Sequence, residues 1–278
     1  MKPLPRVPVL LLVLACGLVA PVAIADGAPP ASYEEAWSDI LSRVVTDDGL
    51  VRYDLLAGPL RDDFDAVITA IETFDADALK TDAEKLAFWM NAYNAKMIER
   101  VLEADVPEDI EDHGFDFFFE TSVRVAGRDL TLDQIEHDII RRRGGEAYLA
   151  LQPSALDPRL HVGLNCGAIS CPRLRARAFT AATLGAELDR AMRDFVNSPH
   201  HFRFEGDTAV LSSLLDWFGS DFDSTGVPAG DYLLGFLDAD RPDADRLRRL
   251  FAGRSAAEIK AQPNVRFAYE WELNTAGG

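Results

Sequence analysis

The sequence has 278 residues and an acidic composition, with 46 Asp and Glu against 28 Lys and Arg and a formal net charge of −18 at pH 7. This length is sufficient for one large domain or two small ones with a proper hydrophobic core. A surface of this charge repels nucleic acid phosphates and anionic lipid headgroups, so neither is an expected partner.

The start of the chain has the pattern of a secretory signal peptide. Residues 1–25 combine a basic start, Lys2 and Arg6, with an apolar run and a small-x-small ending. The apolar run is short and interrupted by proline, which does not favour a membrane span. We therefore predict a periplasmic or secreted protein whose mature chain, residues 26–278, is a single domain without a transmembrane segment. A lipoprotein anchored through Cys16 is the less favoured alternative.

Hydrophobic spacing predicts alternating helices and extended segments along the mature chain. The expected helices are residues 32–45, 59–74, 81–104, 131–140, 180–196, 213–221, 231–237 and 244–251. The expected extended segments are residues 50–53, 123–125, 160–164, 201–204, 209–211 and 265–271, and the pattern of residues 201–211 predicts a β-hairpin. The predicted fold class is α+β, with helices packed around a modest, mainly antiparallel sheet.

The helix predicted over residues 81–104 begins with a capping box, Thr81 and Glu84, and carries two asparagines in an aromatic stretch. Asn91 and Asn94 are three residues apart and therefore share a helix face. Asparagine is a mediocre helix former, so the pair suggests buried amides that reach into a loop or a site. Capping of backbone groups in a neighbouring loop explains them equally well.

The helix predicted over residues 131–140 carries Glu136 and His137 side by side. Adjacent helical residues point about a hundred degrees apart, so we expect one of the two to face a site. A histidine at such a position is more often packed or at the surface. The basic run that follows, residues 141–143, lies at a helix end where the dipole favours cations, and we expect it to be solvated.

The densest chemical motif is residues 157–172. A predicted short strand, residues 160–164, contains His161 and leads into a tight loop with Asn165, Cys166 and Gly167. Such a loop holds a side chain at a fixed place, which suits a nucleophile or ligand. With Cys16 removed in the leader, Cys166 and Cys171 are the remaining cysteines, and export makes a disulfide between them possible. Inert buried cysteines are a further alternative.

Several segments resemble the family called domain of unknown function 547 (DUF547), in the family's order. They are FWMNAYN (residues 88–94), LTLDQIEH (130–137), DPRLH (157–161), NCGAISCP (165–172), Trp217 with Asp221 and Phe222, and YEWELN (269–274). The resemblance covers most of the chain after the leader and implies a family without an established activity. A more distant similarity is to papain-like and transglutaminase-like cysteine enzymes. These pair a helix-borne cysteine with a histidine on a strand, whereas this chain has Asn91 on its long helix and its cysteine after the His161 segment.

The first functional hypothesis is a thiol-dependent hydrolase or acyltransferase with Cys166 as nucleophile. A nearby imidazolium lowers the pKa of a thiol, so His161 or His137 is the expected partner. Glu136, Asn91 and Asn94 are candidates to orient that histidine. The candidates to contact a small-molecule or peptide-like substrate are the amides of Asn165 and Gly167, as an oxyanion site, together with Asn94 and Arg159.

The second hypothesis is a non-enzymatic periplasmic binding or scaffold domain in which Cys166 and Cys171 are bridged. A metal site is a third reading, but the spacing of His161 and the two cysteines fits no zinc pattern, so we predict neither a metal nor another cofactor. The number of free thiols in the exported protein distinguishes the first two hypotheses.

Overall fold

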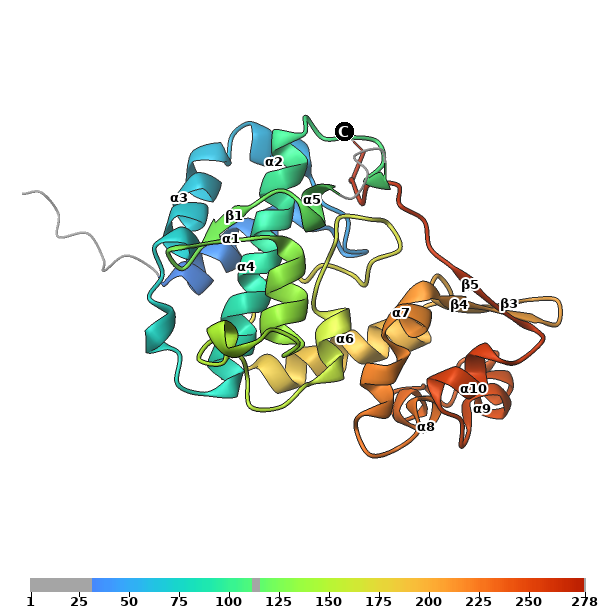
Figure 1. The fold of residues 1–278 in the computed structure, drawn as a ribbon. Coiled ribbons are helices and arrows are strands. Elements are labelled where there is room, and N and C mark those ends of the chain that lie inside the picture. Colours follow the sequence, from blue (N-terminus) through green and yellow to red (C-terminus); the bar gives the residue numbers. More distant parts are fainter. Residues whose placement is uncertain (1–31, 112–115, 278) are drawn as a thin grey trace, which may run out of the picture. The chain divides into compact units, whose positions relative to one another are not determined.

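The fold is built around the long helix α4 (Asp82–Glu103), which begins at the predicted capping box. The structure is a computed structural model that describes residues 32–111 and 116–277 (Figure 1). The predicted leader lies outside the described residues. Among the described helices, none has the length and hydrophobicity needed to cross a membrane.

The predicted α+β class is confirmed, and most of the predicted helices are present. In chain order the helices are α1 (Tyr33–Val44), α2 (Tyr53–Ala57), α3 (Arg61–Glu72), η1 (Ala76–Ala78), α4, α5 (Asp116–Phe119), η3 (Gln134–Ile140), η4 (Glu146–Tyr148), η5 (Pro158–Val162), α6 (Leu184–Asn197), α7 (Ser213–Asp223), α8 (Ala229–Leu234), α9 (Ala244–Phe251) and α10 (Ala256–Lys260). The strands are β1 (Val123–Val125), β2 (Arg128–Leu130), β3 (Phe202–Glu205), β4 (Thr208–Ser212) and β5 (Val265–Ala268).

A first hydrophobic core surrounds α4. Most of this helix is buried from Leu86 to Val101, because aromatic and aliphatic residues occur on nearly all of its faces. Helices α1 and α3 add Trp37 and Phe64, whose ring centroids are 5.9 Å apart. Figure 1 shows α4 among α1, α2 and α3. The two asparagines of α4 are therefore surrounded by protein, with Asn91 1% and Asn94 4% exposed.

A second core lies between helices α6 to α10 and the sheet β3-β4-β5 (Figure 1). The predicted hairpin is confirmed: β3 and β4 pair antiparallel, with Phe202 opposite Leu211. Strand β5 joins β4 in parallel, because the chain passes through α7 to α10 before it returns to the sheet. A separate antiparallel pair, β1 and β2, packs against α3. The strands therefore form two small sheets rather than the single sheet predicted.

The strand predicted over residues 160–164 is wrong. The chain there forms the short 3₁₀-helix η5, with Pro158 at its first turn. The carboxylate of Asp157 accepts the backbone N–H of Arg159 at 3.0 Å and so caps this helix. Proline fixes a backbone angle that suits a helix start, and the capping aspartate favours the same turn. These two residues decide the local structure against the alternating hydrophobic pattern.

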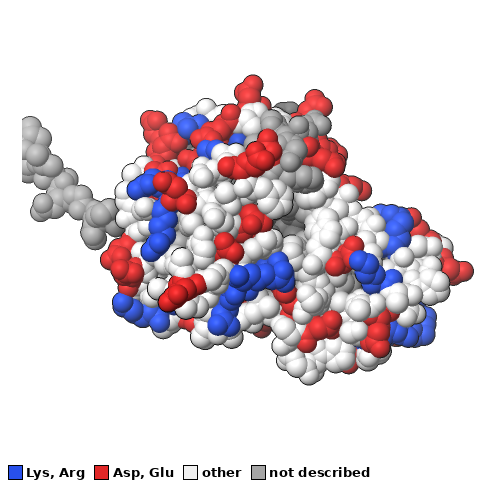
Figure 2. Space-filling view, in the orientation of Figure 1, with Lys and Arg blue, Asp and Glu red and all other residues white. Residues whose placement is uncertain are grey.

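The extended segment predicted over residues 50–53 is only partly correct. Val51 makes isolated bridges to Val45 and Thr275, but Tyr53 already begins α2. In the sequence as a whole, Asp and Glu outnumber Lys and Arg by 46 to 28. Figure 2 shows Asp and Glu side chains spread over the visible face, with Lys and Arg between them.

Candidate functional site

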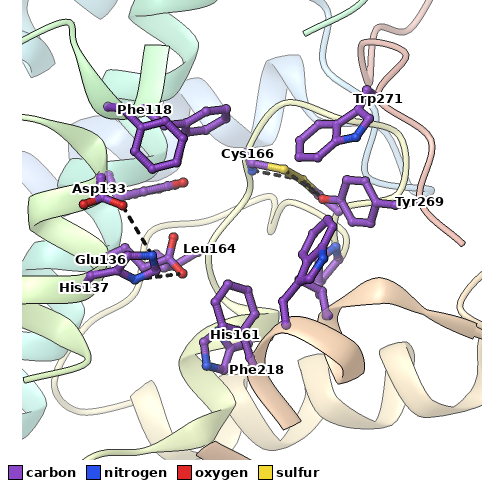
Figure 3. A pocket seen from close by; sticks show the side chains of 16 residues that line it. Phe118, Asp133, Glu136, His137, His161, Leu164, Cys166, Phe218, Tyr269 and Trp271 are labelled. Carbon is purple, nitrogen blue, oxygen red and sulfur yellow. Dashed lines mark hydrogen bonds and ion pairs between the residues drawn. A yellow bond between two sulfur atoms is a disulfide. The ribbon is translucent and has the colours of Figure 1, made fainter. Parts of the chain in front are cut away.

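A cavity of about 290 Å³ lies where η3, the loop after η5, α7 and the C-terminal segment meet (Figure 3). It is lined by Tyr93, Phe118, Phe119, Asp133, Glu136, His137, His161, Leu164, Cys166, Cys171, Pro172, Leu214, Trp217, Phe218, Tyr269 and Trp271. An apolar cavity with a few converging polar groups is the usual form of a small-molecule site. It brings together four of the residues predicted to be catalytic, namely Cys166, His161, His137 and Glu136.

One wall of the cavity is aromatic. Trp217 of α7 stacks on Trp271, with ring centroids 5.9 Å apart and planes 23° apart. Tyr269 lies against both, with centroids 4.8 Å from Trp217 and 4.6 Å from Trp271. Trp217 remains 44% exposed, which is unusual for so large an apolar side chain. The wall therefore offers a continuous ring surface to a ligand.

The opposite wall carries titratable groups: Glu136 and His137 of η3 and Asp133, the residue that precedes this helix (Figure 3). One of Glu136 and His137 was expected to face a site, and both line this cavity. The capping box of Thr131 and Gln134 is present. Beyond it, however, the segment is wound as a π-helix, a rare form that often occurs at functional sites.

Glu136 has the pKa of a group that changes charge near neutral pH. Burial raises its pKa to about 7, against the opposing effect of the Arg141 guanidinium. Burial also lowers the pKa of His137. Nη1 of Arg141 lies 3.0 Å from Nδ1 of His137, and because arginine can only donate, that nitrogen accepts. The neutral ring therefore carries its proton on Nε2, which lies 3.4 Å from a carboxylate oxygen of Asp133.

His161 is held by a buried carboxylate. Its Nε2 lies 2.9 Å from Oδ2 of Asp221, and the same oxygen accepts from Nε of Arg141 at 2.7 Å. Burial lowers the pKa of His161 to about 4, so the ring is neutral at pH 7 and donates from Nε2. The ring stacks on Phe218, with centroids 4.1 Å apart. Although burial opposes it, the hydrogen bonds from His161 and Arg141 hold the pKa of Asp221 well below its usual range.

The prediction that residues 141–143 are solvated is therefore wrong for Arg141. This side chain is 5% exposed and forms an ion pair with Asp221. Neither Arg141 nor Asp221 was predicted to contribute to a functional site. The Asp221-Phe222 pair belonged to a family motif, but nothing local in the sequence indicates that its carboxylate meets a histidine sixty residues away.

Cys166 and Cys171 form a disulfide in the cavity wall, with Cα atoms 6.2 Å apart. The hydroxyl of Tyr269 lies 2.9 Å from Sγ of Cys166 and 3.2 Å from Sγ of Cys171. The backbone N–H of Cys166 donates to Sγ of Cys171 at 3.0 Å. Tyrosine, rather than the predicted histidine, is therefore the polar partner of Cys166, and His161 Nε2 is committed to Asp221.

The amides proposed for oxyanion binding are directed into the protein. The N–H of Asn165 donates to Oδ1 of Asn94 at 2.9 Å, and the N–H of Gly167 donates to Oδ1 of Asn165 at 3.0 Å. Asn94 also donates from Nδ2 to the carbonyl of Gly163. These bonds fix the loop that carries the disulfide, so Asn94, Asn165 and Gly167 position the site rather than contact a ligand.

Two further candidates lie elsewhere. The amide of Asn91 pairs with both the N–H and the carbonyl of Phe179, not with the loop after residue 164. Arg159 forms ion pairs with Asp157 and Asp189 and does not line the cavity. Within residues 32–111 and 116–277, no three His, Cys, Asp or Glu side chains are grouped so that they could hold a metal ion.

Comparison with protein families gives a match to the part of the chain that contains α4, η3 and the disulfide loop. The family described as "Protein of unknown function, DUF547" matches residues 77–196, from before α4 to the end of α6. The predicted resemblance is confirmed over these residues, which are less than half of the chain. This chain carries a DUF547 region. The match includes η3, the disulfide loop and the asparagines of α4, while α7 and the C-terminal aromatic residues lie beyond it. A search of curated proteins found no match, nor did a search of solved structures, so the similarity to papain-like enzymes stays a prediction.

Proposed function

We propose that this DUF547 protein is an exported binding protein that takes a small organic ligand into the 290 Å³ cavity. The observation that carries the proposal is the pairing of an aromatic wall with a titratable wall across one cavity. Trp217, Tyr269 and Trp271 supply ring surface for an apolar or ring-shaped part of the ligand. Glu136, a hydrogen-bond donor when protonated and an acceptor when ionised, orients a polar group on the other side.

The disulfide supports a binding role over a thiol-dependent one. A bridged Cys166 has no thiolate, and the thiolate is the form of cysteine that acts as a nucleophile. The predicted imidazole partner and oxyanion donors are also committed elsewhere, to Asp221 and to asparagine side chains. A disulfide is in turn consistent with the predicted export to an oxidising compartment.

The hypothesis of a thiol-dependent hydrolase or acyltransferase predicts a different state of Cys166. If it were the function, the exported protein would contain free Cys166, and an iodoacetamide-type reagent would label it rapidly at mildly acidic pH. We expect instead that mass spectrometry finds Cys166 bridged to Cys171 in most molecules. Rapid labelling of unreduced protein would restore the enzyme hypothesis.

Binding in the cavity is testable with a neutral apolar probe, N-phenyl-1-naphthylamine, whose fluorescence rises in apolar surroundings. We expect saturable binding to the unmodified protein. Trp217→Ala removes a partly exposed wall residue and should weaken binding about tenfold, since an aromatic contact contributes roughly 1 kcal/mol beyond its area burial. Leu149→Ala is the control, because Leu149 is 60% exposed and does not line the cavity. Equal binding by both variants would contradict the proposal.

A further inference from the structure

The disulfide between Cys166 and Cys171 forms part of the cavity wall rather than lying in the packed core. Its two sulfur atoms have different surroundings. Cys166 is partly exposed, whereas Cys171 is 6% exposed. A small thiol that enters the cavity therefore reaches Cys166 more easily than Cys171.

The hydrogen bonds to the two sulfur atoms also differ, and they favour negative charge on Cys171. Sγ of Cys171 accepts the backbone N–H of Cys166 at 3.0 Å. The Tyr269 hydroxyl lies near both sulfur atoms, 2.9 Å from Cys166 and 3.2 Å from Cys171, so the backbone N–H is the contact that distinguishes them. Hydrogen bonds to a thiolate stabilise the charged form and lower the pKa of the thiol. A thiol of lower pKa is also the better leaving group in disulfide exchange. Cys171 is therefore the favoured leaving group, and Cys166 is the favoured site of attack.

We propose that this disulfide undergoes exchange with low-molecular-weight thiols and that the site of attack is Cys166. In the first step the thiolate R–S⁻ bonds to Sγ of Cys166, the bond between Cys166 and Cys171 breaks, and its electron pair stays on Sγ of Cys171. The product is a mixed disulfide at Cys166 and a thiolate at Cys171. A second thiolate then attacks the sulfur of the bound R group, releases R–S–S–R and leaves both cysteines reduced, so two thiols are oxidised for each protein disulfide.

Tyr269 has a defined part in this step. Burial raises the pKa of its hydroxyl far above the usual value, so the group keeps its proton and can donate to the departing sulfur. Because it lies within 3.2 Å of both sulfur atoms, it can follow the negative charge to Cys171 without rearrangement of the loop. Tyr269 is therefore a positioning and charge-stabilising residue for exchange, whatever other ligand the cavity takes.

The position of the mixed disulfide tests the proposal in the unmodified chain. The oxidised protein is mixed with 2-mercaptoethanol, exchange is stopped with acid, free thiols are alkylated and the peptides are mapped by mass spectrometry. We expect the mercaptoethanol adduct on Cys166 and the alkyl group on Cys171. Adducts mainly on Cys171 would overturn the proposal, as would an absence of exchange at thiol concentrations that reduce oxidised glutathione.

The rate tests the part of Tyr269. Tyr269→Phe keeps the ring but removes the hydroxyl, and we expect exchange to slow at least about tenfold, because the departing thiolate loses a charge-assisted hydrogen bond. Tyr232→Phe, which removes a hydroxyl far from the disulfide in sequence and outside the cavity lining, should leave the rate unchanged. Circular dichroism checks that both variants are folded. Equal rates for the two variants would show that the Tyr269 hydroxyl has no part in the exchange. Binding of the fluorescent probe by the unmodified protein tests the proposed ligand cavity separately.

Discussion

Nε2 of His161 lies 2.9 Å from Oδ2 of Asp221, and both side chains are almost completely buried. The same carboxylate accepts from Arg141, so one residue of α7 connects η5 to the residue that ends η3. These are three of the segments that enclose the cavity. Asp221 thus holds the cavity walls together although it does not line the cavity itself.

The first prediction follows from this connection. Asp221→Asn leaves the buried guanidinium of Arg141 without its counter-charge, and loss of one partner of a buried ion pair costs about 3–5 kcal/mol. We expect a decrease of that order in the free energy of unfolding, measured by urea denaturation at pH 7. Asp129→Asn removes the partner of Arg124 in an exposed pair and should cost less than about 1 kcal/mol. Similar losses in both variants would show that Asp221 is not a central connection.

The second prediction concerns the asparagines of α4. Asn94→Leu leaves the carbonyl of Gly163 and the N–H of Asn165 unpaired, which should lower the free energy of unfolding by about 1–3 kcal/mol. The disulfide loop should loosen as well, so amide hydrogen exchange around residues 163–167 should accelerate.

Asn91→Leu is the matched comparison. It unpairs the backbone of Phe179 and should cost a similar free energy without faster exchange in the disulfide loop. Faster exchange around residues 163–167 in both variants would contradict a local role for Asn94.

Local sequence signals predicted the elements that local chemistry determines. The capping box of Thr81 and Glu84 gave the start of α4 within one residue, and the alternation in residues 201–211 gave the hairpin. The buried position of both asparagines also followed from their place in an aromatic stripe. For the helix start and the hairpin, the interaction that decides the structure lies within a few residues of the pattern, whereas the partners of the asparagines lie far along the chain.

The rest of the site depends on contacts between distant segments. Asp221 meets His161 across sixty residues, and Tyr269 meets Cys166 across more than one hundred. No spacing rule connects such pairs in a single sequence. The winding of η3 as a π-helix is likewise invisible to a hydrophobic pattern, yet it accompanies the placement of Glu136 and His137 on one cavity wall.

The third prediction concerns the leader, which lies outside the described residues. If residues 1–25 are a signal peptide, the mature protein begins at Asp26. Intact mass measurement and N-terminal sequencing of protein from the producing cells should find that end. A lipidated Cys16 would instead show a membrane-anchored lipoprotein.

The ionisation of Glu136 and that of His161 change the free energy of unfolding in opposite directions as the pH rises. Burial raises the pKa of Glu136 from 4.5 to about 7, so its contribution is full below pH 4.5 and is lost as the pH rises towards 7. Burial lowers the pKa of His161 from 6.5 to about 4, so its contribution is full above pH 6.5 and is lost as the pH falls towards 4. The two effects partly cancel between pH 4.5 and 6.5.

The fourth prediction separates them with Glu136→Gln. An amide cannot titrate and resembles the protonated carboxyl, so variant and unmodified protein should have similar free energies of unfolding at pH 4.5. As the pH rises to 8, only the unmodified protein acquires a buried carboxylate, and the variant should become the more stable by up to about 3 kcal/mol. Glu146→Gln reports the effect of removing an exposed charge. A stability difference that stays constant from pH 4.5 to 8, measured by urea denaturation, would show that Glu136 is ionised throughout and that the cavity carries a fixed negative charge.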